Sequence, residues 1–340
     1  MKEFVTGCEK ADQMIAELSA MCAPNNIEPY LHDILTAAMK LGLESSDKGD
    51  LKLVNNALKE LRYSFKIFTP YRNIKKAVIF GSARSKNTSP EYLMAEEFSR
   101  KIVEKGYMVI TGGGPGIMEA GNKGAPHKDF ALNIRLPFEQ KPNPYINEKE
   151  KIINFKYFFT RKLLFIKESN ATALFPGGFG TLDEGFEMLT LVQTGKSAPR
   201  PVVLMDPEGS SYWSDWKRFV DKNLVDAGYI NKEDLDLFTI TKNVDEAVRQ
   251  VTDFYRVYHS IRYVRDLTVF RLNRPVSEAT LKRLNHDFAD ILTSGEMTLS
   301  GHLPEEVERG EFLDLPRLVM KFNRHNYGRL LELIRELNKD

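Results

Sequence analysis

The sequence predicts an α/β protein: a Rossmann-like, doubly wound parallel sheet, with an N-terminal helical region before it and a small C-terminal α+β module after it. Three observations support this prediction. Residues 71–258 alternate short apolar runs with helical patterns, residues 1–70 show helical periodicity alone, and residues 259–340 mix the two. Short apolar runs separated by helices are typical of parallel strands that are covered on both faces. We therefore expect three regions with these boundaries.

The N-terminal region, residues 1–70, contains three helical patterns. They run over Cys8–Met21, Tyr30–Gly42 and Asp50–Phe68. The stretches between them, APNNIEP and ESSDKGD, are rich in residues that favour turns. We predict a helical region whose role the sequence leaves open.

The central region, residues 71–258, contains five apolar runs of strand length, most of them separated by helical patterns. In a doubly wound sheet ligands bind outside the carboxyl ends of the strands, so functional residues are expected at that edge. The predicted strands are Ala77–Phe80, Tyr107–Ile110, Phe130–Ile134, Ala171–Phe175 and Pro201–Met205.

The C-terminal region, residues 259–340, changes pattern again. The strand-like stretches RDLTVFRLN, GEMTLSG and LPRLVMKF are combined with the helical stretches SEATLKRLNHDFADIL and NYGRLLELIRELNKD. Their order along the chain, β-α-β-β-α, predicts a small ferredoxin-like α+β module.

Composition excludes several classes of protein. Lys and Arg number 48 against 47 Asp and Glu, so a net charge of +1 gives no global field toward nucleic acid or an anionic membrane, and neither is expected as a partner. The two cysteines, Cys8 and Cys22, are too few for a disulfide scaffold. No apolar stretch is long enough to span a bilayer, and the start lacks the apolar segment of a signal peptide. We expect a cytoplasmic protein.

Three predicted strands end in glycine-containing turns: Ile79–Ser85, Ile110–Ala120 and Phe175–Glu184. Glycine lets a ligand approach the backbone amides closely, and the N-terminus of a following helix offers free N–H groups with a partial positive charge. A single turn of this kind is more typical of an ordinary strand-to-helix corner. Three of them at one edge of a sheet favour a phosphate-binding cradle.

Two common phosphate motifs are absent. A dinucleotide fingerprint that starts at Gly112 would need glycine where Ile117 stands. Gly195-Lys196-Ser197 ends like a Walker A loop, but Thr190 occupies the position of the required earlier glycine. Gly195 is better interpreted as the residue that ends a helix.

Several residues near the third turn have plain structural interpretations. Thr181-Leu182-Asp183-Glu184 fits a capping box, with Thr181 as N-cap and Glu184 three residues on. Arg161 and Lys162 lie on the amphipathic helical pattern Tyr157–Ser169, where such pairs are usually solvated or paired with acids. Trp213 and Trp216 are predicted to anchor a helix. The helix that carries Arg161 leads directly into a strand, so this arginine could also project toward the cradle.

Taken together, these residues resemble the LONELY GUY (LOG) family of phosphoribohydrolases, whose bacterial relatives are often mislabelled lysine decarboxylases. The family pattern P-G-G-x-G-T-x-x-E matches Pro176 to Glu184 at every specified position, and an arginine-lysine pair precedes it as Arg161-Lys162. The run Gly112–Gly114, with Gly116 and Met118, matches the second loop of the family. The resemblance covers roughly residues 76–258.

The resemblance implies an N-glycosidase, of the EC 3.2.2 type, that converts a nucleoside 5′-monophosphate into a free base and ribose 5-phosphate. It assigns the catalytic pair to Arg161 and Glu184, and it requires neither a metal nor a cofactor. A fixed carboxylate can stabilise the positive charge that develops on the ribose or orient the attacking water, and a guanidinium can hold phosphate or base. The residues expected to bind substrate or phosphate are Gly81, Ser82, Gly113, Gly114, Lys162, Gly177, Gly178, Gly180 and Thr181.

Regions outside the resemblance leave alternatives open. The flanking regions have no counterpart in a minimal family member, which favours a general nucleotide nucleosidase over a cytokinin-specific enzyme. The flanks could form a lid, an oligomer contact or an effector site, and the resemblance implies a homodimer or a higher homo-oligomer. The alternative is a non-catalytic nucleotide-binding or nucleotide-sensing protein with the same fold. The base that is preferred cannot be deduced, because the contacting loops, among them KPNPYINEK, cannot be placed.

Overall fold

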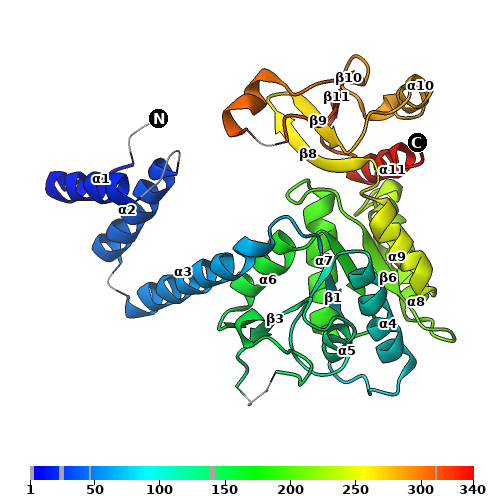
Figure 1. Ribbon diagram of the computed structural model, residues 1–340, viewed down its shortest axis with the longest axis horizontal. Coiled ribbons are helices and arrows are strands. Elements are labelled where there is room, and N and C mark those ends of the chain that lie inside the picture. The colour runs from blue at the N-terminus through cyan, green and yellow to red at the C-terminus, as the bar shows by residue number, and fades with distance from the viewer. Residues whose placement is uncertain (1–3, 23–26, 46, 138–141, 311) are drawn as a thin grey trace. The chain divides into compact units, whose positions relative to one another are not determined.

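The computed structural model describes residues 4–22, 27–45, 47–137, 142–310 and 312–340, and it divides into two compact units, Met1–Tyr63 and Ser64–Asp340. The first unit contains α1 (Glu9–Cys22), α2 (Glu28–Glu44) and most of α3 (Lys48–Phe68), whose last residues belong to the second unit (Figure 1). The three helices predicted in this region are confirmed.

The second unit is built on a parallel sheet with seven strands in the described part of the chain. The strand order is β4-β3-β2-β1-β5-β6-β7. The chain therefore adds strands on one side of β1 as far as β4 and then returns to place β5 on the other side. The topological switch point lies between β1 and β5. The five predicted strands are confirmed as β1 (Lys76–Phe80), β2 (Met108–Thr111), β3 (Asp129–Ile134), β5 (Ala171–Leu174) and β6 (Val202–Met205).

Two strands were not predicted, and both lie at the edges of the sheet. They are β4 (Ile152–Phe155) and β7 (Thr239–Thr241). Each mixes buried residues with exposed or half-buried ones. Neither sequence therefore has the continuous apolar run that identifies a strand covered on both faces.

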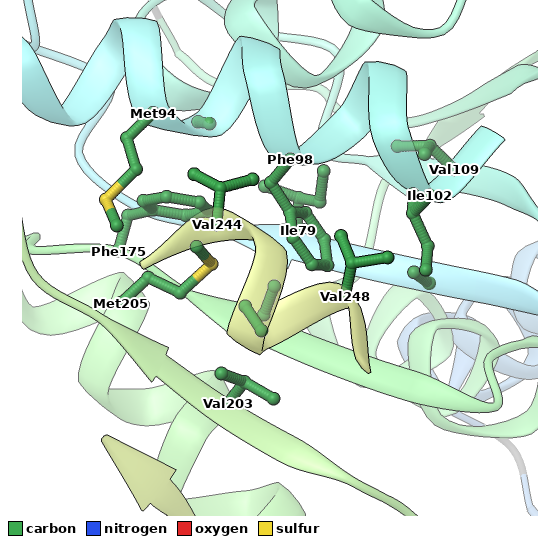
Figure 2. Close-up of a cluster of buried hydrophobic side chains, with 14 of the residues drawn as sticks. Ile79, Met94, Phe98, Ile102, Val109, Phe175, Val203, Met205, Val244 and Val248 are labelled. Carbon is green, nitrogen blue, oxygen red and sulfur yellow. The ribbon is translucent and has the colours of Figure 1, made fainter. Parts of the chain in front are cut away.

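One face of the sheet is covered by α4 (Pro90–Glu104), α5 (Ile117–Gly124) and α9 (Val244–Asp253). Figure 2 shows how Phe98 from α4 and Val248 from α9 pack in one cluster with Ile79 and Val203 from the sheet and with Phe175, which directly follows β5. All five side chains are buried. Burial of each large apolar side chain contributes about 1.5–3 kcal/mol to stability, so this layer holds the strand ends in place.

The other face is covered by α6 (Phe158–Glu168), α7 (Phe179–Gln193) and the end of α3. The ring of Phe165 packs edge-on against that of Phe80, with centroids 4.9 Å apart. Phe68, at the end of α3, packs against Phe130 of β3, with centroids 4.5 Å apart. Gly195 follows α7 with a φ of +68°, so its predicted place at the end of a helix is confirmed.

The helix α8 (Tyr212–Val220) follows β6 and continues into a π-helical turn, η3 (Asp221–Val225). Trp213 is buried and packs edge-on against Trp216, with ring centroids 5.7 Å apart. Trp216 also packs against Phe238, 5.1 Å away. The prediction that these tryptophans anchor a helix is confirmed.

The C-terminal part forms a separate antiparallel sheet, within the second unit, with strand order β10-β11-β9-β8. β11 lies between β9 and β10, which α10 connects, so β9-α10-β10 is a split βαβ unit. β8 precedes the predicted β-α-β-β-α series and was missed. The elements are β8 (Tyr258–Val264), β9 (Leu267–Leu272), α10 (Glu278–Asp287), β10 (Thr298–Ser300), β11 (Arg317–Met320) and α11 (Tyr327–Leu337).

Short 3-10 helices connect these elements: η1 (Thr69–Tyr71), η2 (Lys149–Lys151), η4 (Lys232–Leu237), η5 (Ala289–Ile291) and η6 (Pro304–Arg309). η4 packs tightly against α11, where a side chain at Gly328 would clash with the Glu233 carbonyl group. Within the described ranges, no helix is long and apolar enough to cross a membrane.

Candidate active site

A cavity of about 870 Å³ lies at the carboxyl edge of the parallel sheet, at the switch point between β1 and β5. This is where a doubly wound sheet binds its ligands, and the volume suits a small molecule. The wall is formed by residues that follow β1, β2, β3 and β5, together with α6 and the start of α7. The predicted site residues that line it are Gly81, Ser82, Arg161, Gly177, Gly178, Gly180, Thr181 and Glu184.

Gly113 and Gly114 do not line this cavity, although their neighbour Gly112 does. Gly113 has a φ of +72°, and a Cβ atom placed there would lie 2.9 Å from the Cβ of Ala131. Glycine is therefore required at this position by packing. The expectation that these two glycines touch the substrate stays a prediction.

The loops after β1 and β5 are tied to each other by their backbones. The amide of Ser82 donates to the Pro176 carbonyl oxygen at 3.1 Å. A Cβ atom at Gly177 would clash with the Thr181 hydroxyl and lie 2.9 Å from the Ser82 nitrogen, so only glycine permits this approach. From α8, the Tyr212 hydroxyl donates to the Gly177 carbonyl oxygen at 2.6 Å. The cavity floor is thus a rigid backbone junction.

The start of α7 differs from the prediction. The capping box of Thr181 and Glu184 is wrong: the helix begins at Phe179 with Gly178 as N-cap. The Gly178 carbonyl oxygen accepts from the Thr181 amide at 3.0 Å and from the Leu182 amide at 3.2 Å. Gly178 is extended, with φ −89° and ψ −158°, and this lets the helix start inside the glycine loop. Glu184 therefore lies in the second turn.

The first turn of α7 offers backbone donors next to the cavity. The amides of Phe179 and Gly180 come before the first helical hydrogen bonds, so the helix supplies them with no acceptor. A Cβ atom at Gly178 or Gly180 would meet no atom of the described residues within 4 Å. Open space beside free amides at the positive end of a helix is a favourable place for an anion.

Glu184 is a carboxylate that the fold largely removes from water. Its exposed fraction is 7%. Burial raises the pKa of Glu184, and the positive charges of Lys162 and Arg161 oppose this effect without cancelling it. The shortest contact with a cation joins Lys162 Nζ and Glu184 Oε2 at 3.4 Å. The carboxylate is held beside positive charge without a close hydrogen-bonded ion pair.

Arg161 brings a guanidinium group into the same cavity. Its Cζ lies 5.1 Å from the ring centre of Phe158 and 5.4 Å from that of Phe165, so two aromatic faces hold the cation. Burial lowers the pKa of Arg161, and the charges of Glu184 and Asp183 oppose this. Within the described residues, the buried Nε of Arg161 has no hydrogen-bond partner. The guanidinium thus has unused donor capacity.

Lys162 turns toward the acids of α7 and is not part of the cavity wall. Its Nζ lies 3.0 Å from Asp183 Oδ2 and 2.6 Å from Glu187 Oε2, besides the contact with Glu184. Burial lowers the pKa of Lys162, but hydrogen bonds to Glu187 and Asp183 outweigh it, and the pKa is raised. Lys162 thus remains charged and fixes the side of α7 that carries Glu184. Its predicted contact with phosphate stays a prediction.

The sequence interpretation missed a further cation in the wall. Arg84, three residues beyond Gly81, lines the cavity, and its side chain is exposed. The Arg84 amide donates to the Ser82 hydroxyl at 3.0 Å, which fixes the loop that carries it. The sequence did contain a signal for it, because Arg84 lies in IFGSARS, one of the three glycine-containing turns that predict the phosphate-binding cradle.

A buried polar network holds the second glycine loop. Asn122 Oδ1 accepts from the Thr111 hydroxyl at 2.7 Å and from Asn143 Nδ2 at 2.9 Å, and Asn122 Nδ2 donates to Asp129 Oδ2 at 2.7 Å. The Asn143 amide donates to the Gly113 carbonyl oxygen at 2.9 Å. Burial raises the pKa of Asp129 to about 6, although the Asn122 hydrogen bond lowers it. No spacing in the sequence predicts this network.

Similar proteins were found at both sequence and structure level. Residues 101–251 match the family model described as "Possible lysine decarboxylase". The cytokinin riboside 5′-monophosphate phosphoribohydrolase LOG7 of Arabidopsis thaliana is 28% identical over 187 residues, 53% of this chain and 82% of that protein. A pyrimidine/purine nucleotide 5′-monophosphate nucleosidase of Escherichia coli (strain K12) is 29% identical over 148 residues, 40% of this chain and 31% of that protein.

Among solved structures, the molybdenum cofactor carrier protein of Chlamydomonas reinhardtii is 21% identical, with a TM-score of 0.36, over 53% of this chain and 97% of that one. The family match contains α6 with Arg161, the glycine loop and α7 with Glu184. Through this segment the chain is similar to cytokinin riboside 5′-monophosphate phosphoribohydrolases of the LOG type, and it matches the model described as a possible lysine decarboxylase.

Proposed function

We propose that the protein hydrolyses the N-glycosidic bond of nucleoside 5′-monophosphates and releases a free base and ribose 5-phosphate. The observation that supports this most is the joint placement of Glu184 and Arg161 in one cavity beside the free amides of α7. The family relatives named as phosphoribohydrolases and nucleosidases agree with this chemistry.

In this proposal the 5′-phosphate binds at the start of α7. The amides of Phe179 and Gly180 donate to its oxygens, and Arg84 provides a charge from the opposite loop. The phosphate lies away from the bond that breaks. Its binding energy therefore serves to position the ribose carbon against Glu184.

Bond cleavage places positive charge on the ribose. The C1′–N bond breaks and its electron pair goes to the base nitrogen. Water then forms a new bond to C1′, and the proton that this water loses is taken up by the base nitrogen. Glu184 stabilises the oxocarbenium-like ribose or orients that water. Arg161 holds the base or stabilises the charge developing on its nitrogen, since a guanidinium is too basic to act as the acid.

The buried, ligand-facing carboxylate explains why Lys162 lies where it does. Burial raises the pKa of Glu184, and the positive charge of Lys162 opposes this shift. At 3.4 Å, Lys162 favours the charged form while leaving the carboxylate oxygens able to face the ribose. We therefore assign Lys162 a positioning role.

We also propose that the protein works as a homo-oligomer in the cytoplasm. Phe179, at the cavity wall, is 93% exposed, and the neighbouring Phe158 and Phe159 of α6 are 52% and 53% exposed. Large apolar groups gathered in this way are typical of contact surfaces. Sedimentation equilibrium should give a mass above 38.9 kDa, and a Phe179→Asp variant should shift it toward the monomer.

The function is tested by incubating the protein with AMP, GMP, IMP, CMP, UMP and N6-substituted AMP and measuring free base and ribose 5-phosphate. A Glu184→Gln preparation, purified in parallel, measures contaminating nucleosidase. Glu104→Gln is the matched control, since Glu104 is an exposed carboxylate on α4. We expect release by the native protein and by Glu104→Gln only. If nucleotides bind and none is cleaved, the protein is a nucleotide-binding or nucleotide-sensing member of the fold and the enzyme proposal is wrong.

A further inference from the structure

A second cavity, of about 560 Å³, lies at the opposite, amino-terminal edge of the parallel sheet. Pro201 and Val202 at the start of β6 and Thr239 at the start of β7 form one side of it. Residues of α9 and α11, and of the segments that directly follow these two helices, form the rest. Among the residues that the structure describes, none lines both this cavity and the candidate active site.

The lining of this second cavity is rich in cations. Its charged residues are Arg249, Arg256, Arg335 and Lys339 against Glu246 and Asp253. Glu246 is already occupied on the wall, because it accepts hydrogen bonds from the Thr241 hydroxyl and, at 3.2 Å, from Gln250 Nε2. With four cations against two carboxylates, the described lining carries an excess of positive charge.

Two of these cations, Arg335 and Arg249, are incompletely paired, whereas Lys339 pairs with Glu336 and Arg256 Nη2 donates to the Asn338 carbonyl oxygen. Arg335 Nη2 donates to the Asp236 carbonyl oxygen at 2.6 Å, but its nearest carboxylate oxygen, on Asp236, is 3.6 Å away. Burial lowers the pKa of Arg335, so this charge gains from any added anion. In the part of the chain that the structure describes, Arg249 has no hydrogen bond or ion pair, and its charge acts on Asp245 of the same helix.

The walls are fixed before any ligand arrives. Asn338, which is buried, accepts from the amides of Val257 at 2.7 Å and Tyr258 at 3.1 Å. Its side-chain nitrogen donates to the carbonyl oxygens of Phe254 at 2.7 Å and Ile334 at 2.8 Å. One side chain thus ties α11 to the end of α9 and the start of β8, which makes the cavity a preformed space.

We propose that this cavity binds a small organic anion that carries a phosphate group. Planar guanidinium groups match the geometry of phosphate oxygens, and a phosphate ester carries about 1.5–2 negative charges at neutral pH, enough to balance the surplus of cations. The buried side chains of Val202 and Phe254 provide an apolar surface for the organic part. A concave space with an apolar floor and a few polar groups is typical of small-molecule sites.

The second cavity lies beside α9, which also packs against the core of the parallel sheet. The opposite side of α9 packs Val244 and Val248 against the sheet, in the same cluster as Phe175 (Figure 2). Phe175 directly precedes Pro176 and Gly177 of the candidate active site. The proposal of binding holds whatever reaction the first cavity performs.

Calorimetric titration of the full-length chain with ADP, and separately with inorganic pyrophosphate, tests the proposal. Arg249→Glu removes an exposed cation of the second cavity and Arg84→Glu one of the first. Lys242→Glu makes the same charge change at an exposed residue that lines neither. We expect Arg249→Glu to weaken binding of ADP about tenfold or more, with Lys242→Glu close to the native protein.

The two probes separate the sources of affinity. Equal binding of pyrophosphate and ADP shows that the phosphate groups suffice, and tighter binding of ADP shows that the apolar floor contributes; both support the proposal. If neither ADP nor pyrophosphate binds, the proposal is overturned. A loss of affinity in Arg84→Glu but not in Arg249→Glu assigns the binding to the first cavity, and equal losses in Arg249→Glu and Lys242→Glu show an effect of net charge. Both results also overturn it.

Discussion

Glu184 and Glu306 are both buried carboxylates with two cations near them, yet their surroundings differ. Glu306, in the C-terminal module, is fully buried. Arg271 Nε donates to its Oε1 at 3.1 Å, while Arg317 Nε at 3.0 Å and the Leu303 amide at 3.1 Å donate to its Oε2. Burial raises the pKa of Glu306, but these hydrogen bonds outweigh it and hold the pKa at about 2.

Glu184 lacks this saturation. Its nearest cation contact is 3.4 Å long, burial raises its pKa, and the buried Nε of Arg161 beside it has no partner among the described residues. A carboxylate whose oxygens are all hydrogen-bonded stabilises the fold and has nothing left to offer a ligand. A buried acid and guanidinium with unused capacity, lining a cavity, are typical of a functional site.

The largest effect on stability is expected for Glu306→Gln. The change leaves the charges of Arg271 and Arg317 buried without a counter-charge, which should cost about 3–5 kcal/mol in the free energy of unfolding. Urea denaturation measures it, with Glu305→Gln, at the partly exposed neighbouring carboxylate, as the control. A loss below about 1 kcal/mol would contradict the view that Glu306, with Arg271 and Arg317, mainly stabilises the fold.

Arg161→Ala should act on the rate. Removing a preorganised electrostatic group costs about 10²–10³ in kcat. The change in unfolding temperature should stay small, because the guanidinium is held by aromatic faces and by no hydrogen bond from Nε within the described residues. Arg100→Ala, on the exposed side of α4, is the control. If Arg161→Ala unfolds but each folded molecule keeps the native rate, Arg161 serves stability and not catalysis.

Asp129 is intermediate between Glu184 and Glu306, because its carboxylate accepts a hydrogen bond from the uncharged Asn122 side chain. Burial raises the pKa of Asp129 from 3.8 to about 6, while the charge of Lys151 lowers it and that of Glu148 raises it. Its contribution to stability is therefore present below pH 3.8 and is lost as the pH rises through about 6. Compared with Asp129→Asn, the native protein should lose up to about 3 kcal/mol between these values. Parallel denaturation curves from pH 4 to pH 7 for the two proteins would contradict this.

The smallest expected effect concerns the pH dependence of turnover. Because burial raises the pKa of Glu184 above 4.5 and the proposed reaction uses the carboxylate, the acid limb of kcat should lie above pH 4.5. Glu306 behaves oppositely: its pKa is lowered, so its contribution to stability is present above pH 4.5 and is lost only as the pH falls toward 2. A rate profile measured from pH 4 to pH 9 checks the first part, and a flat acid side would contradict it.

The parts of the fold that the sequence predicted correctly are those in which one pattern decides. The runs of β1, β2, β3, β5 and β6 are continuously apolar because both faces of the sheet are covered. The edge strands β4 and β7 and the hairpin strand β8 carry mixed burial, which resembles that of loops in a sequence. The start of α7 was misplaced because the spacing of Thr181 and Glu184 fits a capping box, whereas the glycines before it let the helix begin earlier.

The sequence predicts those parts of the candidate site whose residues lie close together along the chain. The glycine turns, Arg161 and Glu184 belong to short patterns, and the structure brings most of them to one cavity. Asn122 and the second cavity could not be found in this way, because their partners come from strands and helices far apart in the chain. Only folding brings such groups together.

The most direct test assays Glu184→Gln and Glu306→Gln side by side with AMP. The first variant should bind AMP with nearly native affinity and keep the native urea midpoint, while adenine release falls by about 10²–10⁴. The second should show a lower urea midpoint and, while folded, a native rate. If Glu184→Gln releases adenine and ribose 5-phosphate at the native rate, or if the native protein binds AMP and never cleaves it, the assignment of Glu184 to catalysis is wrong.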